Sequence, residues 1–75
     1  MLILYQRDDC HLCDLALDVL ARARAPGVEL VFIDGQPELE QRYGERVPVL
    51  RDARDGRELG WPFDTATVQA WLLGA

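Results

Sequence analysis

Short apolar runs alternate along this chain with stretches in which apolar residues recur every three or four positions. Residues 2–5 and 47–50 are apolar throughout, and residues 28–33 are apolar at all but one position. Runs of this length bounded by polar or turn residues predict strands. Between the first two runs, apolar residues recur at i, i+3, i+4, i+7, i+8 and i+11, which predicts a helix with one apolar face. That face is expected to hold Leu12, Leu15, Ala16, Val19, Leu20 and Ala23.

Proline and glycine indicate where the elements begin and end. A Pro-Gly pair at residues 26–27 is expected to end the first helix. Pro37 suits the first turn of a short second helix that ends at Gly44. Leu39 and Tyr43 are spaced to form the buried pair of that helix.

The C-terminal third predicts a hairpin and a last helix. An Asp-Gly pair at residues 55–56 is a hairpin turn signal, and residues 58–59 would form a brief fourth strand. Asp64 is placed as the N-cap of the last helix, with Phe63 and Val68 as a hydrophobic staple. The core face of this helix is expected to hold Val68, Trp71 and Leu72.

The predicted element order is β-α-β-α-β-β-α, which places the chain in the α/β class. Strands that alternate with helices favour parallel pairing, and the second strand, apolar on both sides, is expected to be covered on both faces. The first crossover should be right-handed, and the hairpin then adds two strands that are antiparallel to each other.

Composition and charge exclude several classes of protein for this chain. The 75 residues suit one domain, 1–75, with 49% hydrophobic and 28% charged residues. A net charge of −5 and the lack of a basic stretch argue against nucleic-acid binding. No apolar run is long enough to span a membrane, and the first residues lack the basic start of a secretory signal. We therefore expect a cytoplasmic protein without membrane or nucleic-acid partners.

The candidate chemistry lies in Cys10-His11-Leu12-Cys13, which holds the only two cysteines of the chain. A C-x-x-C that opens a helix directly after a strand is the setting of a thiol–disulfide active site. Residues three apart on a helix lie about 5–6 Å apart, so this pair can form and reopen a disulfide with little backbone movement. The helix N-terminus favours a thiolate, which predicts Cys10 as the attacking nucleophile and Cys13, one turn in, as the more shielded resolving thiol.

Two other uses of the cysteines are open to test. A structural disulfide that closes a four-residue ring would stabilise by only about 2 kcal/mol, and it would link no distant segments. A zinc ion usually takes four ligands, whereas one chain offers two cysteines and one histidine. A metal or cluster role would therefore need a second chain.

These residues resemble the thioredoxin superfamily, and its small glutaredoxin-like branch in particular, over nearly the whole chain. The resemblance rests on the cysteine pair after the first strand, on Val47-Pro48 opening the third, and on Gly60 before the last helix. It implies a mixed four-stranded sheet of order 2-1-3-4 with helices on both faces. It also implies that Pro48 is cis and packs beside the cysteines, and that Val47 offers its backbone N–H and C=O to a substrate.

The same resemblance implies a site for glutathione. Arg7 stands three residues before Cys10, where glutaredoxins often carry a basic residue that pairs with a glutathione carboxylate. Arg42 and Arg46 could do likewise, and the alternative for all three is a solvated surface arginine. Gly60 and Asp64 stand where the family commonly shows two glycines and an acidic residue. Trp61 replaces the second glycine here, and His-Leu replaces the usual dipeptide between the cysteines.

The expected function is reduction of protein or glutathione mixed disulfides by the Cys10/Cys13 dithiol. The partner would be a disulfide-containing protein or a small thiol, with no bound cofactor, glutathione as a possible co-substrate, and a monomeric state. One alternative is an iron–sulfur cluster or metal carrier in which Cys10 from two chains shares the centre. Another is a non-catalytic adaptor whose groove binds a protein. His11 and Trp61 could each contribute to the site or be surface and packing residues.

Overall fold

A computed structural model describes residues 1–74 and has the predicted order of elements. The strands are β1 (Leu2–Gln6), β2 (Val28–Phe32), β3 (Val49–Asp52) and β4 (Glu58–Gly60). The helices are α1 (His11–Arg22), α2 (Pro37–Tyr43) and α3 (Thr65–Leu72). The sheet order is β2-β1-β3-β4, with β1 parallel to β2 and antiparallel to β3, and β3 antiparallel to β4. The predicted class, topology and strand order are therefore confirmed.

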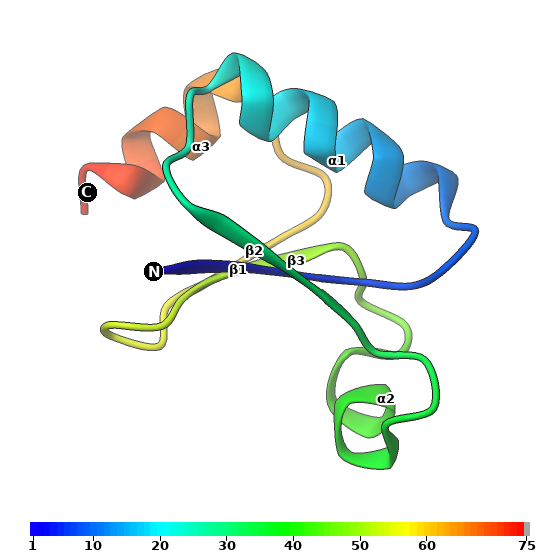
Figure 1. Cartoon of the computed structure of the whole chain (residues 1–75). Helices are drawn as coiled ribbons and strands as arrows, with labels where there is room; N and C mark the ends of the chain where they lie inside the picture. Colours follow the sequence, from blue (N-terminus) through cyan, green and yellow to red (C-terminus); the bar gives the residue numbers. More distant parts are fainter. Residues whose placement is uncertain (75) are drawn as a thin grey trace.

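The helices lie on both faces of the sheet (Figure 1). α1 and α3 cover one face, where Leu4, Leu20 and Val68 belong to the larger buried cluster. α2 lies against the other face, where Ile33, Tyr43 and Val49 form a smaller cluster. Alternate residues of β1 supply the two faces, as the period of a strand requires.

The first helix ends earlier than its Pro-Gly signal predicted. α1 stops at Arg22, and Arg24 adopts a left-handed conformation with φ of 57°. The Ala25 N–H donates to the Leu20 carbonyl, and the Arg24 N–H donates to the Ala21 carbonyl. These two bonds form a Schellman cap. The cap satisfies the last carbonyls of the helix before the chain reaches the proline.

The predicted apolar face of the first helix is confirmed in part, because Ala16, Leu20 and Ala23 are buried and Val19 is half-buried. Cys13, Ala16 and Leu20 are the buried residues of α1, whereas Leu12 and Leu15 are exposed. The prediction counted every apolar residue on that side of the helix. The side of the helix that faces the sheet therefore includes Cys13 and leaves Leu12 and Leu15 in solvent.

The expectation that β2 is covered on both faces is wrong. Leu30 and Phe32 are 45% and 47% exposed, and no residue within β2 is fully buried. Ile33, which follows the strand directly, is fully buried. β2 pairs only with β1 and forms an edge of the sheet. The apolar sequence of this edge strand therefore did not guarantee that it is covered on both faces.

β3 begins two residues later than predicted, at Val49 rather than Val47. The Val47 N–H donates to the Tyr43 carbonyl in a turn after α2, and Pro48 has no N–H to offer to a ladder. The strand then continues through Arg51 and Asp52, which pairs with Leu2. Polar residues were excluded from the predicted strand because only its apolar run was counted.

The other local predictions are confirmed. Pro37 opens α2, and Gly44 caps its C-terminus. Asp64 caps α3 by accepting from the Thr67 N–H at 2.7 Å. Phe63 and Val68 are both buried in the larger cluster, as a hydrophobic staple requires. Among residues 1–74, no helix has the length and apolar character needed to cross a bilayer.

Candidate functional site

A tight turn aims the first cysteine at the start of α1. Asp9 adopts a left-handed conformation with φ of 53°, which aspartate tolerates better than most residues. Cys10 then takes the N-cap position in extended conformation, and its Sγ accepts from the Cys13 N–H at 3.2 Å. The sulfur therefore occupies the place of a capping oxygen, facing the unpaired N–H groups and the positive end of the helix dipole.

Cys10 and Cys13 are joined as a disulfide, with their Cα atoms 5.2 Å apart. This separation lies within the usual range of about 4.4–6.8 Å, so the first helical turn accommodates the bond. Cys10 is half-buried, whereas Cys13 is 1% exposed. An approaching thiol or disulfide can therefore reach the Cys10 sulfur and is kept from that of Cys13.

Val47 and Pro48 lie at the same end of the sheet as the cysteines. Tyr5 pairs with Val49, so continuing the antiparallel register by one position puts Pro48 beside Gln6, at the end of β1. The Val47–Pro48 peptide bond is cis, and Pro48 is fully buried. The Val47 N–H is already bonded to the Tyr43 carbonyl at 3.0 Å. Of the two backbone groups implied for substrate binding, the carbonyl alone is left for that use.

Arg7 contacts α2 and the loop before it. Its guanidinium lies 2.7 Å from the Glu40 carboxylate and 3.5 Å from that of Asp34, and it donates to the Gly44 carbonyl at 2.9 Å. Asp34 in turn accepts from the Asp8 N–H at 2.7 Å. Arg7 thereby ties the loop before the cysteines to α2.

Glu58 on β4 is the residue that Arg42 and Arg46 contact, at 3.5 and 3.2 Å. Its side chain is 17% exposed, and it also accepts hydrogen bonds from the Tyr43 hydroxyl and from Arg51. Burial raises the pKa of Glu58, but the bonds from Tyr43 and Arg46 outweigh it and leave the pKa below its usual value.

Sequence reasoning missed the cluster that Glu58 forms with Tyr43 and these arginines. The single available signal was a glutamate in a brief strand opposite Arg51. The two arginines expected at a glutathione site are thus partly neutralised by a carboxylate of the protein itself.

Gly60 and Asp64 flank the segment that enters α3. Gly60 pairs with Val49 at the end of β4, and Asp64 uses its carboxylate as the cap of α3, which lowers its pKa. Between them, Trp61 is half-buried, and its ring contacts that of Phe63 edge to face with centroids 5.0 Å apart. The backbone N–H of Trp61 donates to the Pro48 carbonyl. Trp61 therefore lies beside Pro48 along the backbone and packs against the larger core cluster, of which Trp71 is a member.

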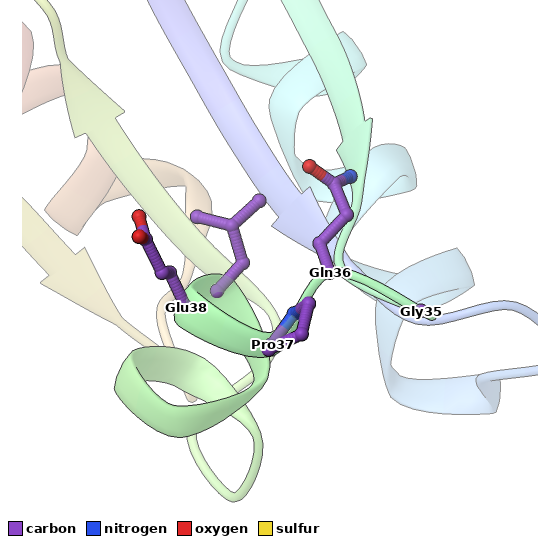
Figure 2. Close-up of a pocket in the computed structure, with 5 residues that line it drawn as sticks. Gly35, Gln36, Pro37 and Glu38 are labelled. Carbon is purple, nitrogen blue, oxygen red and sulfur yellow. The ribbon is translucent and has the colours of Figure 1, made fainter.

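Two depressions on the surface of the described residues are lined by residues other than the cysteines. A shallow depression at the start of α2 is lined by residues 35–39, from Gly35 to Leu39 (Figure 2). A smaller one, lined by Asp8, Phe32 and Asp34, lies where β1 and β2 end. His11 is exposed on the first turn of α1. Among residues 1–74, no group of three or more His, Cys, Asp or Glu side chains is arranged to hold a metal ion.

A mixed sheet of order 2-1-3-4, with a C-x-x-C disulfide at the start of its first helix, defines a thioredoxin-like domain. Comparison with known families is more specific. Residues 1–73 match the model of the glutaredoxin-like domain (DUF836), and the chain belongs to that family.

Solved structures agree with this family and fold. An X-ray structure of protein XcR50 from X. campestris is 60% identical, with a TM-score of 0.94 over 100% of this chain and 99% of that one. The solution structure of XcR50 gives 61% identity and a TM-score of 0.90, over 99% and 94%. Protein Ne2328 from Nitrosomonas europaea is 31% identical, with a TM-score of 0.78 over 93% and 87%. No curated protein matches the chain significantly.

Proposed function

We propose that this protein is a thiol–disulfide oxidoreductase that reduces protein or small-molecule disulfides with its Cys10/Cys13 pair. The observation that carries the proposal is the position of Cys10 as the N-cap of α1, half-buried, and within disulfide distance of a buried Cys13. A disulfide that closes one helical turn links no separate segments, so its structural value is small. Its place at a helix N-terminus, where a thiolate is stabilised, suits exchange chemistry.

The reaction transfers two electrons from the dithiol to the substrate. The Cys10 thiolate attacks one sulfur of the substrate disulfide, which forms a mixed disulfide and releases the other sulfur as a thiolate. The Cys13 thiolate then attacks the Cys10 sulfur, the mixed disulfide breaks, and the second substrate thiolate leaves. The Cys13 thiol releases its proton to water before it attacks, and the two departing thiolates take up two protons from water. The oxidised pair is the disulfide seen in the structure.

A trapping experiment tests this assignment. Cys13→Ser removes the resolving thiol, so the mixed disulfide should accumulate on Cys10 and appear in the mass spectrum as a single adduct. Cys10→Ser is the matched variant and should form no adduct at a comparable rate, because Cys13 is buried. An adduct on Cys13 in that variant, formed as fast, would reverse the two roles.

Glutathione would be a weak co-substrate of this protein. Arg7, Arg42 and Arg46 already contact acidic side chains, and exposed ion pairs contribute only about 0–1 kcal/mol each. The Val47 N–H is also engaged. We expect affinity on the order of millimolar, equivalent to about −4 kcal/mol. Chemical-shift titration that saturates at micromolar glutathione, with shifts at Val47 and Asp64, would contradict this expectation.

Two experiments distinguish the proposed oxidoreductase from a cluster carrier and from a non-catalytic adaptor. A cluster carrier that shares a centre between two chains through Cys10 would be coloured, and dimeric, after anaerobic purification. An adaptor would keep its cellular function after both cysteines are replaced by serine. The proposed oxidoreductase is a colourless monomer that loses all exchange activity in that double variant.

A further inference from the structure

Gln6 is a buried polar residue with no evident structural use. It is the last residue of β1 and is 4% exposed. Among the residues that the structure describes, its Nε2 is the one buried side-chain nitrogen or oxygen without a hydrogen-bond partner. A buried donor without a partner lowers the stability of the folded protein. We therefore expect Gln6 to have a hydrogen-bond partner in a state of the protein other than the disulfide form.

The alternation of β1 places Gln6 under the start of α1. Leu2, Leu4 and Gln6 are the buried residues of the strand, so they point to one face. Leu2 and Leu4 belong to the cluster that includes Ala16 and Leu20 of α1. One helical turn rises about 5.4 Å, and two residues of a strand span about 6.7 Å. Because these lengths are similar, each turn of α1 lies over about one inward-facing residue of β1.

The turn that precedes Ala16 contains Cys13. Cys13 is 1% exposed and lies outside both apolar clusters. Gln6 is the next inward residue of β1 after Leu4, and Pro48, also fully buried, stands beside Gln6 in register. The alternation of β1 and the rise of α1 thus place Cys13 over the end of β1, on the face to which the Gln6 side chain points.

We infer that the Gln6 side-chain amide donates a hydrogen bond to the Cys13 sulfur when that sulfur is a thiolate. The inference rests on the proposed exchange function and adds a residue to it. In the disulfide the Cys13 sulfur is a poor acceptor, which leaves the donor unpaired as observed. A thiolate is a strong acceptor, and hydrogen bonds to charged groups are about twice as strong as neutral ones.

This bond would act in both directions of exchange. When a mixed disulfide is resolved, the Cys13 thiol first gives its proton to water, and the donor raises the share of thiolate that attacks the Cys10 sulfur. When the Cys10–Cys13 disulfide is reduced, an incoming thiolate attacks Cys10. The Cys13 sulfur then departs with the electron pair of the broken bond, and Gln6 stabilises it as it leaves.

The test replaces Gln6 by methionine, which keeps the length of the side chain and removes the donor. Its matched control is Gln41→Met, at an exposed glutamine of α2. In the reduced protein, the ¹³Cβ shift of Cys13 followed against pH should show a higher pKa in Gln6→Met, with about tenfold less thiolate at a given pH. Resolution of a mixed disulfide on Cys10 should slow by a similar factor, while the control stays within twofold of the wild type.

Neighbouring charges are unchanged between these variants. The ionisable side chains of the loop before α1 and of its first turn are the two cysteines, the half-buried Arg7, and the exposed Asp8, Asp9, His11 and Asp14. α3 holds no charged residue apart from its exposed cap Asp64, and the sheet beneath offers Gln6 and Pro48, which are neutral. A second variant, Gln6→Glu, keeps the shape and opposes the thiolate, so it should raise the Cys13 pKa further.

The oxidised Gln6→Met protein should melt at or above the wild-type temperature, because an unpaired buried donor has been removed. Unchanged Cys13 titration in both Gln6 variants would overturn the inference and leave Gln6 a packing residue. The titration needs no substrate, so it is independent of the proposed function. A wild type that reduces no disulfide, with Cys13 still shifted in Gln6→Met, would refute the function and keep the hydrogen bond.

Discussion

Replacing Glu58 by glutamine should destabilise the protein far more than its place on a three-residue strand indicates. The Glu58 carboxylate accepts from the Tyr43 hydroxyl, from Arg46 at 3.2 Å and from Arg51 at 3.4 Å, while its side chain is 17% exposed. These bonds join β4 to β3, to the last residue of α2 and to the turn before Pro48. Loss of the charge would therefore loosen the segment that carries Val47 and Pro48.

The expected magnitude follows from these contacts. A hydrogen bond to a charged group contributes about 1.5–3 kcal/mol, and the bond from the buried Tyr43 is of this kind. Arg42 and Arg46 are more than half exposed, so each pair adds about 0–1 kcal/mol. Glutamine keeps an acceptor for the hydroxyl and recovers part of this sum. We expect a loss of about 2 kcal/mol in the free energy of unfolding, or roughly 8–16 °C in Tm.

Urea denaturation of the oxidised protein measures this loss, with Glu45→Gln as the control at an exposed glutamate. The control should lie within about 0.5 kcal/mol of the wild type. A double-mutant cycle with Tyr43→Phe should then show that the two losses are not additive. A Glu58→Gln variant as stable as the Glu45→Gln control would refute the view that this carboxylate organises the sheet edge.

The stability of the wild type should depend on pH through the same group. The pKa of Glu58 is lower in the folded protein than its ordinary value. Its contribution is therefore complete above the ordinary glutamate pKa of about 4.3 and is lost as the pH falls below it. Glu58→Gln should flatten that part of the stability curve.

Three further changes test other parts of the fold. Asp52 is buried and accepts a hydrogen bond from the Arg54 side chain, which lowers the Asp52 pKa to about 2. The stability of the wild type should therefore fall as the pH decreases from the ordinary aspartate pKa toward that value. Asp52→Asn should remove this acid dependence in urea titrations at low pH. Asp64→Ala removes the cap of α3 and should cost about 0.5–2 kcal/mol by the same assay, with a loss near zero showing that another group caps the helix. Val68→Ala opens a cavity in the larger core cluster and should cost at least about 1 kcal/mol in thermal unfolding, while Ala70→Ser on the exposed side of α3 should change little.

Most of the fold could be predicted from short-range signals in the sequence, such as helix caps, prolines and the spacing of apolar residues. The C-x-x-C after the first strand, Pro37 before the second helix and Asp64 before the third each fix an element through a short-range rule. The 3.6 period of the first helix is equally local. These signals sufficed for the element order, and the resemblance to glutaredoxins supplied the strand order.

What could not be predicted depends on how far neighbouring elements extend. The exposed Leu12 and Phe32 are apolar in sequence, and only the tertiary arrangement, in which β2 is an edge strand, leaves them in solvent. The same holds for the arginines expected at a glutathione site. Arg42 and Arg46 contact Glu58 because the β3–β4 hairpin brings that residue to α2. Gln6 lies just outside the apolar run 2–5 that predicts the first strand, although it continues the alternation of Leu2 and Leu4.

A redox titration of the Cys10–Cys13 pair tests the proposed function most directly. The protein is equilibrated with dithiol buffers of known potential, and the fraction of disulfide is measured by mass spectrometry after alkylation. An exchange-active pair should titrate as a two-electron couple with a midpoint between about −270 and −120 mV, the range of disulfide oxidoreductases. A midpoint below about −300 mV is typical of structural disulfides and would contradict a catalytic role for these cysteines.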